Sequence, residues 1–233
     1  LIEGTTLATL FILFFAQSDS PALSRSPAMT ALRTLRMTTH GDYSLAEKTL
    51  VEFLSRYPSE PKLWYRLAAI RYDQEKYTEA LKVAQTLSEN EGVMAQALRA
   101  NLEALCLAEL GQDLDRALFL ARQSLDLTEP NSPFYLAALD TLGWIHYHRK
   151  DYVKAQYYVQ LAKSRVGWLR TPQVSVLDYH LAMILLARGK DKEGLELLKT
   201  VLSARHGHKP SIKRSQTALA KLGLSIATSG PRS

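Results

Sequence analysis

Cysteine is nearly absent from this sequence, in which Cys106 is the only one among 233 residues. A single thiol excludes an intramolecular disulfide framework, and its place in the apolar run LEALCLAEL predicts a small buried core residue rather than a reactive group. Proline and glycine are also scarce, at 9 and 11 residues, and no low-complexity tract occurs. Long disordered regions are therefore not expected between the two ends. Because 46% of the residues are hydrophobic, the chain can bury a sizeable core.

The sequence also lacks a long stretch of charges of the same sign. The formal net charge is +6, yet lysine and arginine alternate with acidic residues along most of the chain. The local excess is confined to RHGHKPSIKR at residues 205–214, which carries no acid. Neither a nucleic-acid-binding motif nor a regular pattern of basic and aromatic residues accompanies this charge, so we do not expect nucleic acid as a partner.

Motifs of catalysis and of cofactor binding are absent too. The sequence has no glycine-rich phosphate loop, no His-Glu zinc motif, no nucleophile elbow and no spaced set of Cys or His ligands. His146 and His148 are two residues apart. They lie about 200° apart around a regular helix and cannot chelate one metal ion from it. We therefore predict a protein that is not an enzyme and has no catalytic residue, cofactor or metal site.

The sequence does contain a helical pattern that repeats. Apolar residues recur three and four positions apart in segments such as LWYRLAAIRY and LDTLGWIHY, and a second amphipathic run follows each after a short polar break. Each predicted second helix has a small residue near its start, and these residues are 34, 37, 38 and 39 positions apart: Ala46, Ala80, Ala117, Ala155 and Gly194. Such a period, without a strand pattern, predicts an all-α array of about five helix pairs.

These repeats resemble tetratricopeptide repeats, in which Trp or Leu, Leu and a small residue mark the first helix, and Tyr and Ala mark the second. The second repeat supplies Trp64, Leu67, Ala68, Tyr77 and Ala80, and the fourth supplies Leu139, Leu142, Gly143, Tyr152 and Ala155. The resemblance covers about residues 26–205 and is closest in style to exported bacterial members of the family. It implies a right-handed α-solenoid and a protein partner, but it does not identify the partner, because the fold serves many.

The predicted domain boundaries follow from these patterns. We expect an apolar N-terminal segment and linker at residues 1–25, a repeat array at 26–205 and a polar tail at 225–233. The repeats are placed at about 27–60, 61–94, 97–131, 136–171 and 175–208. A stack of helix pairs leaves its last face uncovered, so the helix predicted at 209–224, which is polar on one side, is interpreted as a C-terminal capping helix.

One face of the fourth repeat is a candidate binding surface. Asp140, Trp144 and His148 are four residues apart and share one side of a helix, which in tetratricopeptide repeats lines the concave groove. By the same mapping the predicted protein-binding groove comprises Tyr65, Tyr72, Asp140, Trp144, Tyr147, His148, Tyr179 and Met183. An aromatic lining suits an apolar or helical peptide. The Lys and Asn with which chaperone-binding members hold a carboxylate are missing there, so we do not expect a heat-shock chaperone as partner.

The N-terminal segment is the other informative feature. Thr5 to Ala16 is an uncharged apolar run of twelve residues. As a helix it would be about 18 Å long, shorter than the roughly 30 Å hydrocarbon core of a membrane. Its large side chains form one apolar stripe, the predicted docking or anchoring residues: Leu7, Leu10, Phe11, Phe14 and Phe15. Burying five such side chains is worth on the order of 8–12 kcal/mol before entropy is subtracted, so this stripe needs a cover.

Two functions follow from these features, and the sequence leaves both open. In the first, the chain is a structural subunit. It binds copies of itself to form a homo-oligomer or polymer, or it is part of a larger envelope complex. Its apolar segment then inserts into a neighbour. In the second, residues 1–16 contact a membrane, and the tethered repeats hold a client peptide in the aromatic groove. For both we expect the bacterial cell envelope, on the periplasmic or extracellular side.

Overall fold

The computed structural model describes residues 26–87, 92–130, 132–166, 172–204 and 207–223. Every regular element in these ranges is an α-helix, which confirms the predicted all-α class. The predicted apolar segment at 1–25 and the polar tail at 225–233 lie outside them. None of the helices in these ranges is both long enough and apolar enough to cross a membrane.

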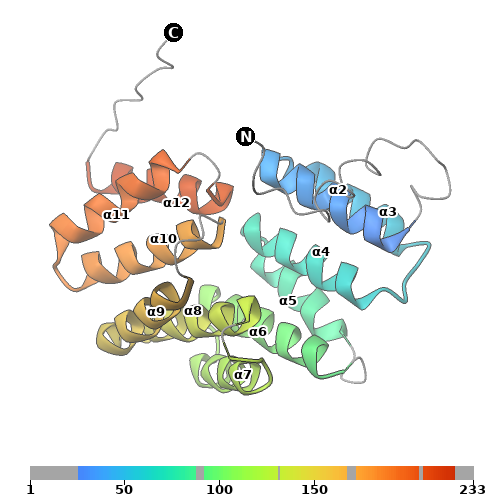
Figure 1. Ribbon diagram of the computed structural model, residues 1–233, viewed down its shortest axis with the longest axis horizontal. Helices are drawn as coiled ribbons and strands as arrows, with labels where there is room; N and C mark the ends of the chain where they lie inside the picture. Colours follow the sequence, from blue (N-terminus) through green and yellow to red (C-terminus); the bar gives the residue numbers. More distant parts are fainter. Residues whose placement is uncertain (1–25, 88–91, 131, 167–171, 205–206, 224–233) are drawn as a thin grey trace, which may run out of the picture. The chain divides into compact units, whose positions relative to one another are not determined.

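The chain divides into two compact units, and each is built from antiparallel helix pairs (Figure 1). The N-terminal unit ends at Leu87 and contains two pairs. They are α2 (Pro27–His40) with α3 (Tyr43–Leu54), and α4 (Pro61–Asp73) with α5 (Tyr77–Thr86). The core of this unit includes Ala46, Leu50, Leu54, Leu63 and Leu67.

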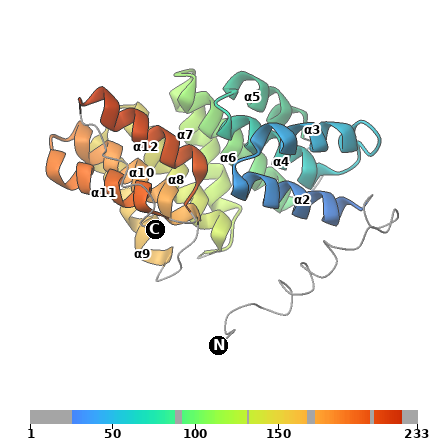
Figure 2. The ribbon, with the colours of Figure 1, turned by 90° about the horizontal axis from the view of Figure 1, so that it is seen from above.

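The C-terminal unit begins at Ser88 and contains three pairs and a last helix. The pairs are α6 (Val93–Glu109) with α7 (Leu114–Asp126), α8 (Pro133–His148) with α9 (Tyr152–Val166), and α10 (Pro172–Ala187) with α11 (Asp191–Ser203). The last helix, α12 (Lys209–Lys221), packs on α10 and α11 (Figure 2). The predicted five pairs and C-terminal capping helix are therefore confirmed. The capping helix ends at Lys221, short of the predicted 224, where Gly223 adopts a left-handed conformation.

Local sequence determines where several helices begin. Ser26 accepts a hydrogen bond from the Met29 amide at 3.2 Å, and Ser132 accepts one from the Tyr135 amide at 3.1 Å. In both cases a proline occupies the first turn, where its fixed φ fits and its missing N–H costs nothing. The hydroxyls satisfy amides that a helix start would otherwise leave without a partner.

A left-handed residue follows the first helix of every pair. It has a φ between 62° and 96° and occupies equivalent places in the five turns: Gly41, Glu75, Gly111, Lys150 and Gly189. Glycine is used in three of these turns because it reaches this conformation without the steric cost that a Cβ carries. The turn is tight enough to bring the second helix directly back onto the first.

Small residues let the paired helices approach closely. Ala46, Ala80, Ala117 and Ala155 have no exposed surface, and Gly194 is buried. Gly143 on α8 faces Ala155 and Val159 on α9 so closely that an added Cβ would lie 2.5 Å from Val159 Cγ2 and 3.0 Å from the Ala155 carbonyl oxygen. An added Cβ at Gly194 on α11 would likewise lie 3.0 Å from the Ala182 carbonyl oxygen on α10. Two of the residues that define the sequence period, Ala155 and Gly194, therefore lie at helix crossings.

A carboxylate holds the end of α4 and the following turn against α3 in the N-terminal unit. Glu47 accepts hydrogen bonds from Arg71 at 2.9 Å, Gln74 at 2.9 Å and Lys76 at 2.6 Å. Burial raises the pKa of Glu47, but these three hydrogen bonds outweigh it and hold the pKa at about 2. The carboxylate is thus charged in the folded state over the whole neutral range.

The first prediction concerns the α8–α9 crossing. Gly143→Ala should lower the free energy of unfolding of the C-terminal unit by roughly 1–3 kcal/mol, because the new methyl group overlaps Val159. Urea denaturation followed by circular dichroism measures this. In the double variant with Val159→Ala the loss should be smaller than the sum of the two single losses. A strictly additive result would show that the two side chains do not meet.

The second prediction concerns pH. Because the folded pKa of Glu47 lies below its ordinary value of 4.5, its stabilising contribution is present above pH 4.5 and disappears as the pH falls toward 2. Glu47→Gln should remove on the order of 2 kcal/mol at pH 7 and flatten the acid side of the stability profile. Glu52→Gln is the matched control, because Glu52 pairs with Lys48 in the open solvent. Equal acid sensitivity of both variants would contradict the assignment.

Candidate functional site

The residues of the predicted groove fall in both units. Tyr65 and Tyr72 lie on α4 of the N-terminal unit and are half-buried. The other six lie in the C-terminal unit, on α8 and α10: Asp140, Trp144, Tyr147, His148, Tyr179 and Met183. Those six come together around Trp144, and that region is the candidate site.

Aromatic rings surround the Trp144 indole on several sides. Tyr147 stacks on it with ring centroids 4.6 Å apart, and His180 stacks on it at 4.0 Å. His148 meets it edge-on at 5.2 Å, and the Tyr179 ring lies 6.0 Å away. Only 4% of Trp144 is exposed. Together with the carboxylates and the arginine described next, we call this set the Trp144 cluster.

A buried carboxylate orients the histidine that stacks on Trp144. The two carboxylate oxygens of Asp140 lie 2.8 and 3.0 Å from His180 Nδ1. The Asp140 carboxylate accepts in this arrangement, so His180 Nδ1 carries a hydrogen and donates a hydrogen bond to it. Asp140 and His180 are 8% and 3% exposed, and their mutual hydrogen bonds offset the cost of burying both polar groups.

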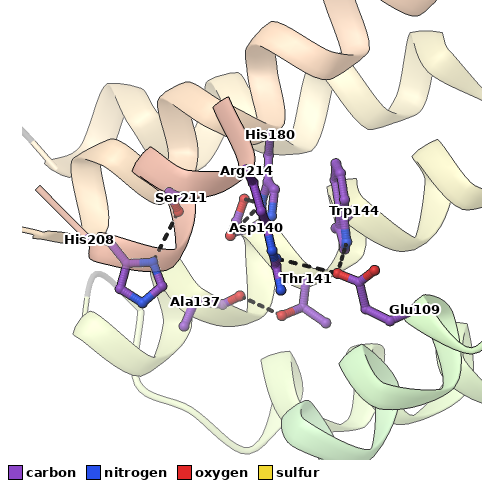
Figure 3. Close-up of polar contacts among 9 residues, drawn as sticks. All are labelled: Glu109, Ala137, Asp140, Thr141, Trp144, His180, His208, Ser211 and Arg214. Carbon is purple, nitrogen blue, oxygen red and sulfur yellow. Dashed lines mark hydrogen bonds and ion pairs between the residues drawn. The ribbon is translucent and has the colours of Figure 1, made fainter. Parts of the chain in front are cut away.

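A second carboxylate links three helices of the unit (Figure 3). Glu109, at the end of α6, accepts a hydrogen bond from Trp144 Nε1 on α8 at 3.1 Å. Arg214 Nη1 on α12 lies 3.6 Å from the same carboxylate oxygen, and both side chains of this ion pair are only 13% exposed. Burial lowers the pKa of His148, whose Nε2 lies 3.9 Å from Glu109. His148 is therefore neutral at pH 7, and Arg214 is the cation that faces Glu109.

The helix α12 brings Arg214 to this place. Its start is fixed by the His208 backbone amide, which donates a hydrogen bond to Ser175 Oγ on α10 at 2.7 Å. Near its other end, Ala218 and Leu219 belong to the same hydrophobic cluster as Trp144 and Tyr179. Figure 3 shows the Arg214 side chain reaching past Asp140 and His180 toward Glu109.

These contacts correct one expectation about the groove. Asp140, Trp144 and Tyr179 were expected to line a surface open to a partner, but all three are buried within their own unit. The reason is that the rings pack on one another and that α12 and Arg214 complete the enclosure. Tyr147, His148 and Met183 are half-buried. The role of these residues in binding a protein stays a prediction.

Sequence reasoning missed three members of the cluster: Glu109, His180 and Arg214. Glu109 ends α6, and Arg214 lies about a hundred residues later on α12, so their pairing depends on the path of the chain between them. His180 directly follows Tyr179, which was included in the predicted groove. Its position next to Tyr179 was the only sign of it in the sequence, because the burial of a histidine cannot be read from the sequence.

The side chains of the Trp144 cluster are buried and paired with one another, which limits the reactions they could take part in. Asp140 is engaged by His180, and Glu109 by Trp144 and Arg214. The nearby Cys106 has no exposed surface, and burial, with Glu109 and Glu103 adding to it, raises its thiol pKa to about 12, so it is a poor nucleophile. Within the described ranges no group of three His, Cys, Asp or Glu side chains could hold a metal ion.

Comparison with known proteins identifies the fold. No protein-family model and no curated protein sequence matches the chain. Among solved structures, it is similar to a thermophilic TPR protein of Thermus thermophilus, with 18% identity, 84% of this chain and 100% of that chain covered, and a TM-score of 0.61. It is also similar to BtubC from P. vanneervenii, with 16% identity, 98% and 96% covered, and a TM-score of 0.55. These likenesses show that the chain has a tetratricopeptide-repeat fold.

The third prediction tests whether Trp144 is a core residue. Trp144→Ala should lower the free energy of unfolding by roughly 3–5 kcal/mol, because it leaves a cavity and removes the donor to Glu109. Tyr157→Ala is the matched control, since Tyr157 is 60% exposed on α9 and should change stability by no more than about 0.5 kcal/mol. Denaturation in urea measures both. A loss below about 1 kcal/mol for Trp144→Ala would place the indole outside the core.

Proposed function

We propose that this chain is a protein-interaction scaffold without enzymatic activity, a structural subunit that joins copies of itself or a larger assembly in the bacterial cell envelope. The joint is the apolar stripe of the N-terminal segment, Leu7 to Phe15. This proposal rests on the repeat fold, on the closed cluster in the C-terminal unit and on apolar side chains that the second helices leave exposed.

The closed Trp144 cluster is the observation that carries the proposal. The polar groups of the Trp144 cluster hold one another, Asp140 with His180 and Glu109 with Arg214. The face that carries Asp140 and Trp144 is already covered by the chain's own α12. Contacts that join this protein to an assembly are therefore assigned to other parts of the chain.

Exposed apolar side chains offer such contacts. Phe119 on α7 and Tyr157 on α9 are 66% and 60% exposed, and Val153 on α9 is 67% exposed. Phe119 and Tyr157 each follow the small crossing residue of their helix, Ala117 or Ala155, by two positions. Equivalent positions in successive pairs face the same way, so these side chains provide an apolar surface against which a neighbour's stripe can be buried.

The envelope location belongs to the same proposal. The style of the repeats resembles exported bacterial proteins, and an apolar stretch at the N-terminal end of the sequence suits a protein that works at or beyond a membrane. Partners are therefore expected to be proteins, copies of this chain first among them.

The alternative is an adaptor tethered to a membrane through residues 1–16 that holds a client peptide. It is favoured by Tyr65 and Tyr72 of the N-terminal unit, which keep part of their surface accessible. A tyrosine side chain is uncharged at neutral pH and offers an apolar ring to a peptide. In this case the chain would be monomeric in water and would bind liposomes.

The fourth prediction uses a charge placed on the apolar stripe. In the full chain, Phe14→Asp should abolish concentration-dependent assembly, because it puts a carboxylate into the buried joint. Thr9→Asp is the matched control, because Thr9 lies on the opposite side of the predicted helix and should leave assembly unchanged. Analytical ultracentrifugation over a range of concentrations measures both.

Three outcomes would decide against the structural-subunit function. Phe14→Asp could assemble as the unchanged chain does, in which case the stripe is not the joint. Both variants could lose assembly equally, which would show a general charge effect. The unchanged chain could be monomeric in water and bind liposomes, and the tethered adaptor would then replace the structural subunit.

A further inference from the structure

The last helix is held differently from the others of the C-terminal unit. Helices α6 to α11 are paired with a neighbour along the chain, whereas α12 follows the last pair and packs on both α10 and α11. It covers a face formed by α10 and α11, together with Glu109 of α6, which Arg214 reaches, and Trp144 of α8, which shares a hydrophobic cluster with Ala218 and Leu219. We call this the α12-covered face.

The buried side of α12 is poor in large apolar side chains. Its buried residues are Pro210, Ser211, Ser215, Ala218 and Leu219. Leu219 is the only large aliphatic residue among them, while Ile212 is half-buried and packs against the same hydrophobic cluster. The hydroxyl of Ser215 is fully buried without a hydrogen-bond partner among the described residues. With two large aliphatic side chains in contact, α12 buries less apolar area than a helix with a leucine-rich face, and it is held correspondingly more weakly.

The face beneath α12 is, in contrast, rich in recognition groups. It presents the edges of several aromatic rings around Trp144 and two carboxylates, Asp140 and Glu109. Aromatic rings and a buried carboxylate paired with an arginine are typical of surfaces where a few residues provide most of the binding energy. In this structure Arg214 supplies the cation from within the same chain.

We propose that the α12-covered face is a helix-binding site, that α12 occupies it in cis as a displaceable plug, and that the partner is an amphipathic helix of another protein that places an arginine opposite Glu109. This inference goes beyond the proposed N-terminal joint: the Trp144 cluster is closed while α12 is in place, and a partner helix binds there only after α12 has left. Binding and release of α12 would determine whether the site is open.

The plug itself shows what the partner helix must carry. Along α12 the contacting residues are Ser211, Arg214, Ser215, Ala218 and Leu219, at spacings of three, four, seven and eight from the first. This is one face of a helix. A partner with small residues at the serine positions lets its backbone approach Trp144 and Tyr179. A partner helix with a larger apolar residue in place of Ala218 or Ser215 would bind more tightly than α12 only if the aromatic rings around Trp144 moved apart.

The fifth prediction uses a peptide as the probe. A fluorescent peptide of residues 209–221, KPSIKRSQTALAK, is the probe. Its binding is measured to three forms of the full chain: the unchanged chain, the Arg214→Gln variant and the Lys213→Gln variant. Arg214→Gln weakens the plug, so that chain should bind the peptide at least about ten-fold more tightly than the unchanged chain. Lys213 is exposed on α12, and its variant is the matched control that should behave like the unchanged chain.

Two further arms assign the binding to Glu109. A peptide that itself carries Arg214→Gln should not bind the Arg214→Gln chain, and the chain with both Arg214→Gln and Glu109→Gln should not bind the unchanged peptide. Absence of peptide binding to a folded Arg214→Gln chain would overturn the proposal. If the Arg214→Gln chain assembled more than the unchanged chain, the helix that occupies the site would be α12 of a second copy. The proposal of a helix from another protein would then be wrong.

A measurement on the unchanged chain keeps the proposal testable if Arg214→Gln fails to fold. Amide hydrogen exchange read by mass spectrometry should show α12 exchanging at least about ten-fold faster than α10 and α11, through a local opening that leaves the three pairs folded. Equal protection of α12 and α10 would mean that α12 leaves only when the whole unit unfolds. It would then be a permanent cap, and the proposal would be wrong.

Discussion

The close crossing of two helices at a small residue is the contact on which the rest of this structure depends. At Gly143 the α8 backbone lies so near α9 that a single methyl group has no room beside Val159. The same kind of crossing recurs at Gly194, where an added Cβ would lie 3.0 Å from the Ala182 carbonyl oxygen. Ala46, Ala80 and Ala117, at the equivalent sequence positions, are fully buried. Because the paired backbones are this close, large side chains are directed away from the crossing, into the space between successive pairs, where they form the cores of the two units.

This arrangement also explains why polar residues are buried near the end of the chain. Successive pairs place α6, α8 and α10 so that Glu109, Asp140 and His180 converge on Trp144. Two carboxylates there need donors, which Trp144, His180 and Arg214 supply. Arg214 comes from α12, so the last helix does more than shield an apolar end: it completes the charge balance of the interior. A helix that replaces α12 must therefore carry an arginine as well as apolar residues in the places of Leu219 and Ile212.

The fold could be predicted from the sequence, whereas only a small part of the candidate site could be. The recurring small residues and the Tyr–Ala spacing predicted the pairs, because close packing and tight turns depend on short-range patterns. Trp144 was correctly placed on one face with Asp140, but its burial was not foreseen. That burial depends on α12, whose Arg214 meets Glu109 across about a hundred residues. Periodicity gives the face of a helix that a residue occupies, whereas the segment that finally covers this face is set by the tertiary path of the chain.

The distance between α12 and α6 in the intact protein tests the central claim most directly. Spin labels are attached through Gln112→Cys, just after α6, and Lys213→Cys, since both positions are exposed and Cys106 is fully buried. Without a partner, pulsed electron paramagnetic resonance should give one narrow distance distribution, because Arg214 holds α12 against Glu109. A broad distribution extending to long distances would contradict the account, because α12 would then not cover the Trp144 cluster.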